Sequence, residues 1–385
     1  MKQNVTVHGN RSGARLDSST PPGVEPSLPR DPQDPDAGLT TPAIMQPPLD
    51  WLSRLLDMVS VQGHLDLRCS YGSPWLIAQD RALPGEIPYH ILVSGSAVLE
   101  DPSGGPPQQL TAGDILLVPH GSPHRLHDGS GAPPSPARKR ATPNLIISEN
   151  SGTGDRVDLL CGRFILTPQS ERLLRDYLPL SLVVRAFEHG SDNEPPAGAQ
   201  LPGLVALMRR ESALESLGGR AMLNALSTAL FALTLRVASE SHEAPSGLLA
   251  LAAHPRLARA LTALFQEPAC AWTLPQLARL CHLSRATFAR QFQDRLGRSA
   301  SDLLTDIRMT LAANELRKSS VSTAAVADMV GYQSEAAFQR AFKQRMGVTP
   351  AQWRRGGPFA RIGATTRRMS MGLRLNNINK PTIRP

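Results

Sequence analysis

Two groups of side chains in this sequence have the types and the spacing to do chemistry. In the C-terminal third, Arg290 and Gln293 recur 50 positions later as Arg340 and Lys343. Arginine can donate two hydrogen bonds to guanine and glutamine can bond adenine, so this chemistry would be the recognition of base edges in DNA. In the N-terminal half, cysteine and histidine side chains have types suited to redox chemistry or metal binding.

The residues predicted to contact DNA share one face of two short helices, and the alanines among them leave room for the backbone or meet a thymine methyl group. The predicted contact residues are Arg285, Ala286, Ala289, Arg290 and Gln293 in the first helix, and Glu335, Ala336, Gln339, Arg340 and Lys343 in the second.

A repeated pattern predicts the elements that position these faces. In each copy, a small residue (Ala278, Ala327) stands where two helices of a helix-turn-helix approach closely, and a serine (Ser284, Ser334) can cap the second helix. The face opposite the contact residues is predicted to be core. It carries Phe288, Phe292 and Leu296 in the first copy, and Phe338, Phe342 and Met346 in the second.

Between the two copies, residues 302–319 are predicted to form one helix with a buried stripe of Leu304, Ile307, Leu311 and Leu316. Such a helix is roughly 27 Å long. That length is close to the ~34 Å that separates successive major grooves on one side of B-DNA. One chain is therefore predicted to contact two adjacent grooves.

Residues from about 249 to 355 resemble the DNA-binding domain of the AraC family of bacterial transcription regulators. Two departures from the family pattern are His282 in the first turn, where glycine is frequent, and Ala300, where proline is usual. The alternative is an unrelated helical bundle. The residues that carry the resemblance are Trp272-Thr273, Leu277-Ala278, Ser284-Arg285, Phe288-x-Arg290-x-Phe292, Gly297, Arg308, Ala312, Val326-Ala327, Gly331-Tyr332, Ser334, Phe338-x-Arg340-x-Phe342, Gly347-Val348-Thr349-Pro350 and Trp353-Arg354.

The distribution of charge agrees with DNA binding. The chain carries a formal net charge of +8, and residues 249–355 hold 15 Lys and Arg against 7 Asp and Glu. The tail from residue 356 onward has six basic residues and no acidic one. Basic charge concentrated on the motif-bearing region is what phosphate contact requires, although a solvated basic surface would show the same excess.

Composition also divides the chain and indicates its compartment. Residues 1–47 are rich in Pro and small polar residues and are predicted to be disordered, and Met45 is a second possible translation start. The sequence shows no signal-peptide core and no run of about 18 apolar residues, which predicts a cytoplasmic protein without a membrane partner. The four cysteines are then expected to be reduced.

Short apolar runs separated by Gly and Pro between residues 49 and 187 predict a small β-barrel, preceded by a helix over residues 51–60. The predicted strands include residues 75–78, 89–93, 97–99, 114–118, 145–147, 157–160 and 164–166.

Gly113, Pro119, Gly121 and His124 resemble the second signature of the cupin family, which implies a histidine facing the barrel interior. The first signature is only partly present: His90 matches it, but Leu92 replaces a second histidine. Because two histidines are too few for the usual catalytic iron centre, they would bind zinc or copper with a further ligand, or else be ordinary interior histidines.

The combination of a cupin barrel and an AraC-type domain resembles a subgroup that includes RclR-type regulators, whose barrel senses chemical signals, oxidants among them. The local match covers Trp51-Leu52-Ser53-Arg54-Leu55-Leu56, Gly63-x-Leu65-x-Leu67-Arg68-Cys69 and Leu160-Cys161-Gly162-Arg163-Phe164.

This resemblance implies that Cys69 is the reactive thiol, with Arg68 beside it favouring the thiolate. Cys161 would be its partner or simply a small buried residue. Cys281 is expected to lie in the core.

Residues 201–238 are predicted to form two helices broken at Gly218-Gly219, with an apolar stripe at Leu223, Leu226, Leu230, Leu233 and Val237. Packing within the monomer is the default interpretation. The resemblance also implies helical dimer contacts near here, so a homodimer is the second interpretation.

These observations predict an α+β protein with five parts. They are a disordered extension (1–47), a cupin-type β-barrel sensor (48–189), a linker with helical packing or dimer contacts (190–248), an all-α domain with two helix-turn-helix motifs (249–356) and a basic disordered tail (357–385).

The predicted function is a non-enzymatic, sequence-specific transcription regulator, an activator by resemblance. It would bind promoter DNA and RNA polymerase and respond to a small molecule, a metal or an oxidant. The alternatives are a cupin metalloenzyme with an appended DNA-binding module and a non-specific DNA-coating protein; differing contact faces on the two helices argue against the latter.

Overall fold

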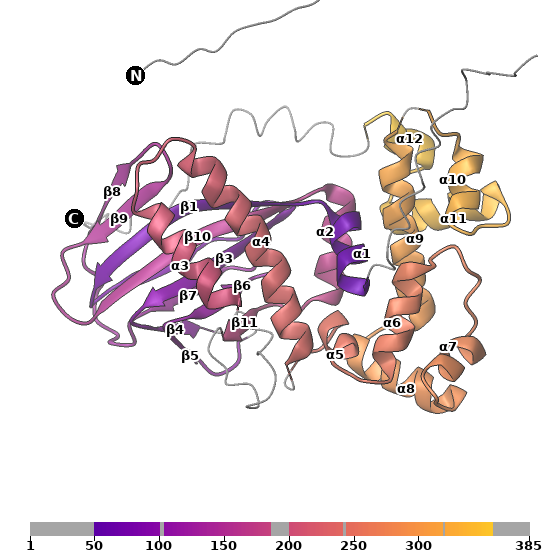
Figure 1. Cartoon of the computed structure of the whole chain (residues 1–385), viewed down its shortest axis with the longest axis horizontal. Helices are drawn as coiled ribbons and strands as arrows, with labels where there is room; N and C mark the ends of the chain where they lie inside the picture. The colour runs from indigo at the N-terminus through magenta and orange to yellow at the C-terminus, as the bar shows by residue number, and fades with distance from the viewer. Residues whose placement is uncertain (1–49, 101–103, 186–199, 242–243, 319, 357–385) are drawn as a thin grey trace, which may run out of the picture. The chain divides into compact units, whose positions relative to one another are not determined.

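The computed structural model describes residues 50–100, 104–185, 200–241, 244–318 and 320–356, with a short helix first, the strands next and most of the helices after them (Figure 1). The extension predicted over residues 1–47 and the tail predicted over 357–385 lie outside this range. The strands are β1 (Val61–Gly72), β2 (Leu76–Gln79), β3 (Glu86–Ser94), β4 (Ser96–Glu100), β5 (Gln108–Thr111), β6 (Asp114–Leu117), β7 (His124–His127), β8 (Ala137–Ala141), β9 (Ile146–Asn150), β10 (Arg156–Leu166) and β11 (Leu182–Arg185).

Helices precede the strands, cover them and form the C-terminal region. They are α1 (Trp51–Val59), α2 (Pro168–Tyr177), α3 (Gln200–Ser212), α4 (Gly219–Glu240), α5 (Leu248–Ala252), α6 (Leu257–Gln266), α7 (Leu274–Leu280), α8 (Arg285–Leu296), α9 (Ala300–Leu316), α10 (Thr323–Met329), α11 (Glu335–Met346) and α12 (Pro350–Arg354).

The strands form two sheets with a shared apolar core. The larger sheet has the order β11-β6-β3-β10-β1-β9-β8, and the smaller has the order β2-β7-β4-β5. Leu67 and Leu116 from the larger sheet pack in one cluster with Ile77, Leu99 and Leu126 from the smaller. This cluster is the interior of the barrel.

Strand β1 changes the face that it buries. A register shift between Leu65 and Leu67 interrupts its pairing with β10. Leu65 packs in the core between the larger sheet and the helices, whereas Leu67 and Cys69 pack inside the barrel. Because side chains alternate along a strand, the bulge places Cys69 in the interior and Arg68 on the helical side.

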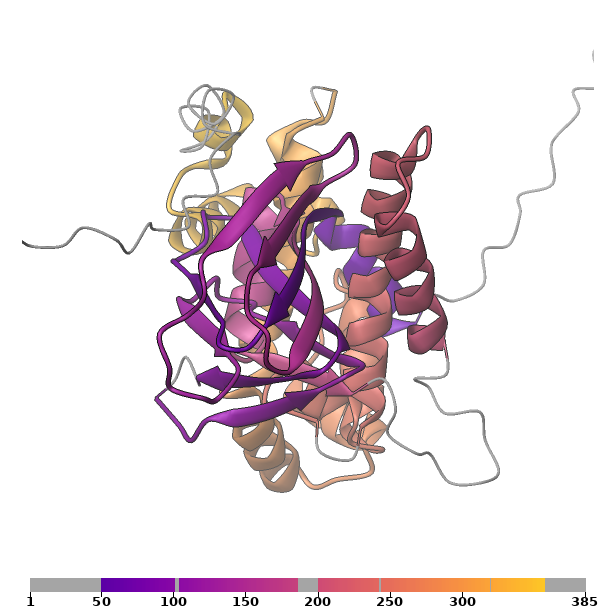
Figure 2. The ribbon, with the colours of Figure 1, turned by 90° about the vertical axis from the view of Figure 1, so that its left-hand side faces the viewer.

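Helices α3 and α4 lie along one side of the strands (Figures 1 and 2). The Gly63 N–H of β1 donates a hydrogen bond of 2.9 Å to Thr228 Oγ1 of α4. A side chain at Gly63 would collide with the backbone of Thr228, so glycine permits this close approach. The helices are therefore held directly against the strand that carries Cys69.

By length and composition alone, α4 is also able to span a membrane, with a mean hydropathy of 1.5 over an 18-residue window. It is the one such helix among the described residues, and 39% of that window is buried in this structure. Its polar Ser227 and Thr234 bond carbonyl groups one turn earlier. A helix that packs along a sheet passes the same test, so this is weak evidence for a membrane span.

The C-terminal helices pack around α9. The first helix-turn-helix shares the large core with the sensor helices, and Trp51 of α1 packs against Phe265 of α6 with ring centroids 6.3 Å apart. The second motif forms a separate cluster around Met309, Leu316 and Trp353. Helix α9 thus contributes to both cores and joins the two motifs.

The predicted α+β architecture is confirmed, and the differences are local. Residues 157–160 and 164–166 belong to the single strand β10 instead of two strands. The α3–α4 break extends over residues 213–218, ahead of the predicted Gly218-Gly219 break, and α9 begins and ends two to three residues before the predicted helix. Strands β1, β5, β7, β8 and β11 were not among the predicted strands, and β5, β7 and β8 have weak apolar signals.

Candidate functional site

In each helix-turn-helix, a serine side chain caps the N-terminus of the second helix. Ser284 accepts a hydrogen bond from the Thr287 N–H at the start of α8, and Ser334 accepts one from the Ala337 N–H at the start of α11. Both predicted N-caps are therefore present, which satisfies backbone donors that the helix leaves free. Ala278 and Ala327 are both buried, as the repeat predicts.

The aromatic side chains of these helices face inward. Phe288 and Phe292 are at most 1% exposed, as are Phe338 and Phe342. The rings of Phe288 and Phe292 have centroids 5.3 Å apart, and those of Phe338 and Phe342 are 5.6 Å apart. Buried rings on one side fix the rotation of each helix, so the opposite side is presented to solvent.

All ten residues predicted to contact DNA are exposed on these outer faces. Across the described part of the chain, no ion pair or side-chain hydrogen bond occupies Arg290 or Arg340. Two of the others have local partners: the Gln293 amide donates to the Gly297 carbonyl at 2.9 Å, and the Gln339 amide donates to Glu335 at 2.9 Å. Both arginines can therefore reach a ligand without breaking an internal contact.

The two turns differ as the sequence indicates. His282 adopts a positive φ of 52°, in the left-handed region where the second copy has Gly331 at φ 80°. Gly331 also lies against the Ala269 carbonyl oxygen, which leaves no space for a side chain. Histidine adopts this backbone conformation more readily than most residues do, but it is less favourable for histidine than for glycine. The second turn thus has a stricter requirement for glycine than the first.

The structure places Cys69 and Cys161 together inside the barrel. Leu67 pairs with Cys161 across β1 and β10, and Cys69 pairs with Leu159, so the two cysteines are diagonal neighbours. They are 0% and 7% exposed, respectively, and both are free thiols. Their side chains lie close enough for each thiol to shift the pKa of the other. Sequence reasoning left the role of Cys161 open, and its placement favours a partner of Cys69.

The electrostatics differ from the sequence-based expectation at Arg68. Its guanidinium bonds both Asp158 oxygens, at 3.1 and 2.7 Å, on the side of the sheet opposite Cys69. The hydrogen bond from the Cys161 thiol lowers the pKa of Cys69 despite burial, with smaller contributions from the Tyr71 hydroxyl and the Lys139 charge. The same interaction, together with burial, raises the pKa of Cys161. The prediction for Arg68 was therefore wrong, because neighbours along a strand point to opposite faces.

Both predicted barrel histidines are buried beside the thiols. His90 Nδ1 lies 3.0 Å from Cys161 Sγ, and His90 Nε2 lies 2.8 Å from His124 Nε2. His124 Nδ1 lies 2.9 Å from the Ser122 carbonyl oxygen, which can only accept. His124 Nδ1 therefore carries a hydrogen and His90 Nε2 donates to His124 Nε2. His90 Nδ1 then carries none, so it accepts from the Cys161 thiol whenever the one proton of that thiol is not directed at Cys69.

Burial keeps these histidines neutral. It lowers the pKa of His90 well below its usual value, with a further contribution from His124, and it lowers the pKa of His124. No group of three or more His, Cys, Asp or Glu side chains in the described ranges is arranged to hold a metal ion. The predicted zinc or copper site at His90 and His124 consequently remains a prediction, and hydrogen bonding within the cluster accounts for both rings.

A further polar cluster was missed by sequence reasoning. Asp306 of α9 accepts a hydrogen bond of 2.6 Å from Tyr177 of α2 and lies 3.1 Å from Arg345 of α11. Arg298, in the turn before α9, lies 3.6 Å from Asp306 and 3.0 Å from Asp176 of α2. The Asp306 cluster, defined by these five residues, joins the sensor region to both helix-turn-helix motifs.

Two family models match separate parts of the chain. Residues 50–240 match a model described as Cupin, and residues 277–356 match one described as a helix-turn-helix domain. The first range contains the thiols and buried histidines, and the second contains all ten exposed contact candidates.

Relatives match over both ranges together. An uncharacterized HTH-type transcriptional regulator of Haemophilus influenzae is 29% identical over 80% of this chain and 99% of its own length. The RCS-specific HTH-type transcriptional activator RclR of Escherichia coli is 29% identical over 80% of this chain and 97% of its own. A protein of Streptomyces antibioticus named as an AraC-like transcription regulator is 30% identical over 80% and 99%, respectively.

Proposed function

The chain belongs to the AraC-like transcription regulators, and from this premise we propose that α8 and α11 bind adjacent major grooves of promoter DNA. The observation that carries this proposal is the pair of exposed helical faces opposite buried Phe288 and Phe338. Arg290 and Arg340 occupy equivalent positions on those faces. Each can donate two hydrogen bonds to a guanine, while the surrounding basic side chains contact phosphates.

The signal that we propose is oxidation of the Cys69–Cys161 pair. The Cys69 thiolate would attack a peroxide oxygen, which breaks the O–O bond, forms a sulfenic acid on Cys69 and releases water after protonation. The Cys161 thiol would then attack the Cys69 sulfur, forming the disulfide and releasing a second water. The two thiols lose two electrons and the peroxide gains them. Burial of both thiols favours small, uncharged oxidants.

Oxidation would change the environment of α4, because β1 carries Cys69 and also bonds Thr228 of α4 through Gly63. A disulfide would draw the two sulfurs to covalent distance and so would shift β1 relative to β10, and α4 packs against β1. Helix α4 in turn contacts α5, which precedes the first helix-turn-helix. This path supports a change in DNA binding upon oxidation.

Footprinting of the full chain on DNA upstream of its own and neighbouring genes tests both proposals. The protein is compared reduced, treated with hydrogen peroxide, and as Cys69→Ser under both conditions. We expect protection of two adjacent major grooves, altered by peroxide in the wild type only. Cys281→Ser is the matched control, because this buried cysteine lies outside the barrel.

The outcomes separate the two proposals. Protection that does not change with peroxide, or that changes equally in Cys69→Ser, contradicts the thiol signal and leaves DNA binding intact. No protected site on any upstream DNA contradicts the proposed groove contacts.

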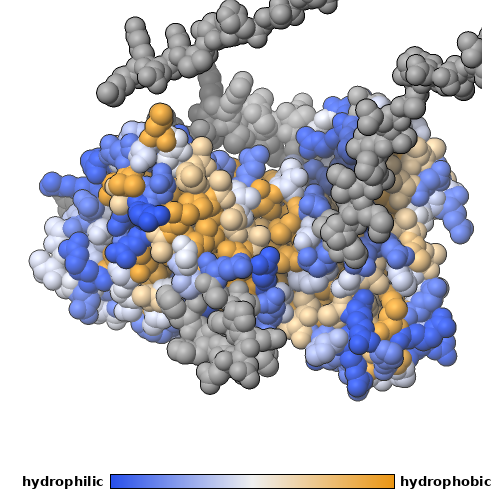
Figure 3. Space-filling view, in the orientation of Figure 1, coloured by the Kyte–Doolittle hydropathy of each residue, from blue (hydrophilic) through white to orange (hydrophobic). Residues whose placement is uncertain are grey.

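We also propose a homodimer that forms through the outer face of α4. Met222 is 50% exposed, and Ala225, Leu226, Ala229 and Leu233 continue the same apolar face at helical spacing. Hydrophobic side chains gather over α3 and α4 in the space-filling view (Figure 3). Sedimentation analysis of Ala229→Glu, with wild type as reference, should show a shift to monomer; an unchanged dimer places the interface elsewhere.

The remaining partners follow from the relatives. One relative is named as an activator, so we propose activation through contact with RNA polymerase in the bacterial cytoplasm. A cupin metalloenzyme has less support, since the described side chains offer no metal-binding group of three or more. We therefore propose a regulatory role without catalysis.

A further inference from the structure

A cavity of about 620 Å³ lies between α3 and the outer side of the larger sheet. Strands β1 and β3 contribute Arg68, Leu92 and Val93, the β5–β6 turn contributes Ala112 and Gly113, and α3 supplies the remaining wall. Its volume falls within the range of roughly 300–1,000 Å³ that holds small organic ligands. The cavity is separate from the thiol pair, which lies inside the barrel.

Most of the wall is apolar. Val93 of β3 lies opposite Pro202, Val205 and Ala206 of α3, whereas the Leu92 side chain is 2% exposed and packs inside the barrel. Such a surface gains free energy when it is removed from water, so it favours a ligand with a hydrocarbon body. An inorganic anion would leave this part of the wall uncovered.

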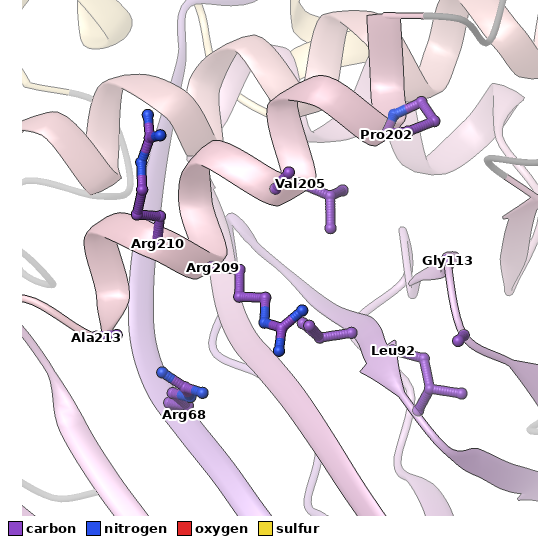
Figure 4. Close-up of a pocket in the computed structure, with 11 residues that line it drawn as sticks. Arg68, Leu92, Gly113, Pro202, Val205, Arg209, Arg210 and Ala213 are labelled. Atoms are coloured by element: carbon purple, nitrogen blue, oxygen red, sulfur yellow. The ribbon is translucent and has the colours of Figure 1, made fainter.

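The polar groups of the cavity are cationic. Arg68 uses Nε and Nη2 to bond Asp158, which leaves the N–H groups of Nη1 available. Arg209 of α3 has no ion-pair or side-chain hydrogen-bond partner within the described ranges. Figure 4 shows its side chain extending from α3 toward the strand of Leu92, whereas Arg210 extends the opposite way. A guanidinium facing an apolar wall is stabilised when an anion joins it.

We infer that this cavity binds an amphipathic monocarboxylate, with its carboxylate on Arg209 and Arg68 and its hydrocarbon body against Val93, Pro202 and Val205. The pair formed by Arg68 and Asp158 is neutral, so Arg209 supplies the net charge that selects an anion. Arg210 also lines the cavity, but its side chain extends away from the strand of Leu92, so one carboxylate matches the one free guanidinium among the described lining residues that extends toward that strand.

A bound carboxylate would fix α3 against the sheet. Helix α3 packs on α4, which carries the proposed dimer face, so occupancy provides a second input to the regulator. This regulatory consequence rests on the proposed function. Binding itself does not, and it can be measured without DNA.

Isothermal titration calorimetry on the reduced full chain tests the inference with octanoate, 1-octanol and acetate. We expect octanoate to bind at one site per chain, 1-octanol to bind at least tenfold more weakly, and acetate to show no saturable binding. Arg209→Gln should weaken octanoate binding by about tenfold or more, because it removes a charged hydrogen-bond donor, and leave 1-octanol unchanged. Arg81→Gln, at an exposed position on the β2–β3 loop, is the matched control and should bind octanoate normally.

A second variant tests the apolar wall. Ala206→Phe places a ring in the cavity from an exposed position of α3 and should weaken octanoate and 1-octanol alike. Equal affinity for octanoate and 1-octanol, unchanged octanoate binding by Arg209→Gln, or no saturable octanoate binding overturns the inference. If Arg209→Gln changes the sedimentation coefficient but not octanoate binding, the cavity belongs to an interface between copies and the inference is also wrong.

The same preparations distinguish this failure from failure of the proposed function. Octanoate binding with no DNA footprint would contradict the groove contacts alone. A footprint that responds to peroxide in a chain that does not bind octanoate would contradict only the carboxylate site.

Discussion

Arg290 and Arg340 occupy equivalent positions in two structurally similar motifs, but their neighbours differ. Arg290 is followed on its face by Gln293, whereas Arg340 is followed by Lys343 and preceded by Glu335. Lysine contacts phosphate as a point charge, and arginine can bond a guanine edge with two donors. The two helices should therefore prefer different base sequences, which gives the site a direction along the DNA.

Replacing Arg290 by alanine should lower DNA affinity by about 1–3 kcal/mol and relax the base preference at one position. The measurement is binding to a set of operators in which each base pair is changed in turn. Lys343→Ala is the comparison, expected to weaken binding on all sequences and to reduce the salt dependence. An equal loss for Arg290→Ala on every operator would show that Arg290 contacts a phosphate instead.

Cys161 should control how readily Cys69 is oxidised. The thiolate is the reactive form, and the Cys161 hydrogen bond is the largest cause that lowers the Cys69 pKa. The rate at which peroxide oxidises Cys69 should rise with pH through that pKa and then level off. In Cys161→Ala this increase in oxidation rate should occur at higher pH. Mass spectrometry of the Cys69 peptide measures the rate.

Tyr71→Phe provides the control for that series. Its hydroxyl makes a smaller contribution than Cys161 does, so the pH of the rise should move less. If the rise occurs at the same pH in wild type and Cys161→Ala, the thiol at position 161 does not stabilise the Cys69 thiolate.

At the scale of elements, the second turn depends on Gly331. Gly331→Ala should destabilise the second helix-turn-helix by more than the roughly 1–2 kcal/mol that a left-handed conformation costs an ordinary residue, because its methyl group would also collide with the Ala269 carbonyl. Thermal unfolding measures this loss. Gly347→Ala is matched, since Gly347 also has a positive φ of 77° but its alanine methyl group would meet no described atom within 4 Å.

Equal losses in Gly331→Ala and Gly347→Ala would mean that the contact with Ala269 has no energetic effect. A larger loss for Gly331 would explain why the first motif tolerates His282 at the corresponding turn, where the sequence alone indicated only a departure from the family pattern.

The elements that sequence could predict are those with a strong one-sided pattern. Phenylalanine spacing and serine caps located α8 and α11 because both signals are local. Strand β10 was divided in two because Gly162 and Arg163 interrupt its apolar run. Gly162 lies beneath the Tyr89 ring, where no side chain fits, and Arg163 pairs with Asp66 across the strand at 2.9 Å. The residues that explain Gly162 and Arg163 lie on neighbouring strands, so the local sequence of β10 does not reveal them.

The candidate sites also differ in how much of each could be predicted from a local sequence pattern. Helical periodicity predicted which residues of α8 and α11 are exposed. Strand alternation would have placed Arg68 and Cys69 on opposite faces, although the bulge after Leu65 decides which face is interior. The approach of Cys69 to Cys161, the α3 cavity and the Asp306 cluster all join residues far apart in sequence, so no local pattern could predict them.

In the whole molecule, the Asp306 cluster is one of the polar contacts between the sensor region and the DNA-binding helices; at another, Gln169 of α2 donates to Asn314 of α9 at 2.9 Å. Burial raises the pKa of Tyr177, with the Asp306 charge adding to the effect, so its hydroxyl stays protonated and donates to Asp306. Arg298 also lies over the Tyr177 ring at 5.4 Å. Because Arg345 extends from α11 to the same carboxylate, movement of α2 reaches both motifs through one residue.

Tyr177→Phe removes the hydroxyl and keeps the ring against Arg298. The loss of a hydrogen bond to a charged group should lower stability by roughly 1.5–3 kcal/mol. Asp306 retains both arginines, so each helix-turn-helix should keep its fold and the reduced protein its DNA affinity. The change of footprint upon peroxide treatment should be smaller, since α2 would lose its hydrogen bond to Asp306 and keep its bond to α9 through Gln169 and Asn314.

Tyr332→Phe is the matched control, because Tyr332 is a half-buried tyrosine whose ring lies beside Arg308 and whose hydroxyl makes no hydrogen bond to Asp306. Wild-type response in Tyr332→Phe with a reduced response in Tyr177→Phe would assign the coupling to the Asp306 cluster. A full peroxide response in Tyr177→Phe would instead assign the coupling to contacts that the substitution leaves in place, such as Gln169 with Asn314 and Trp51 with Phe265.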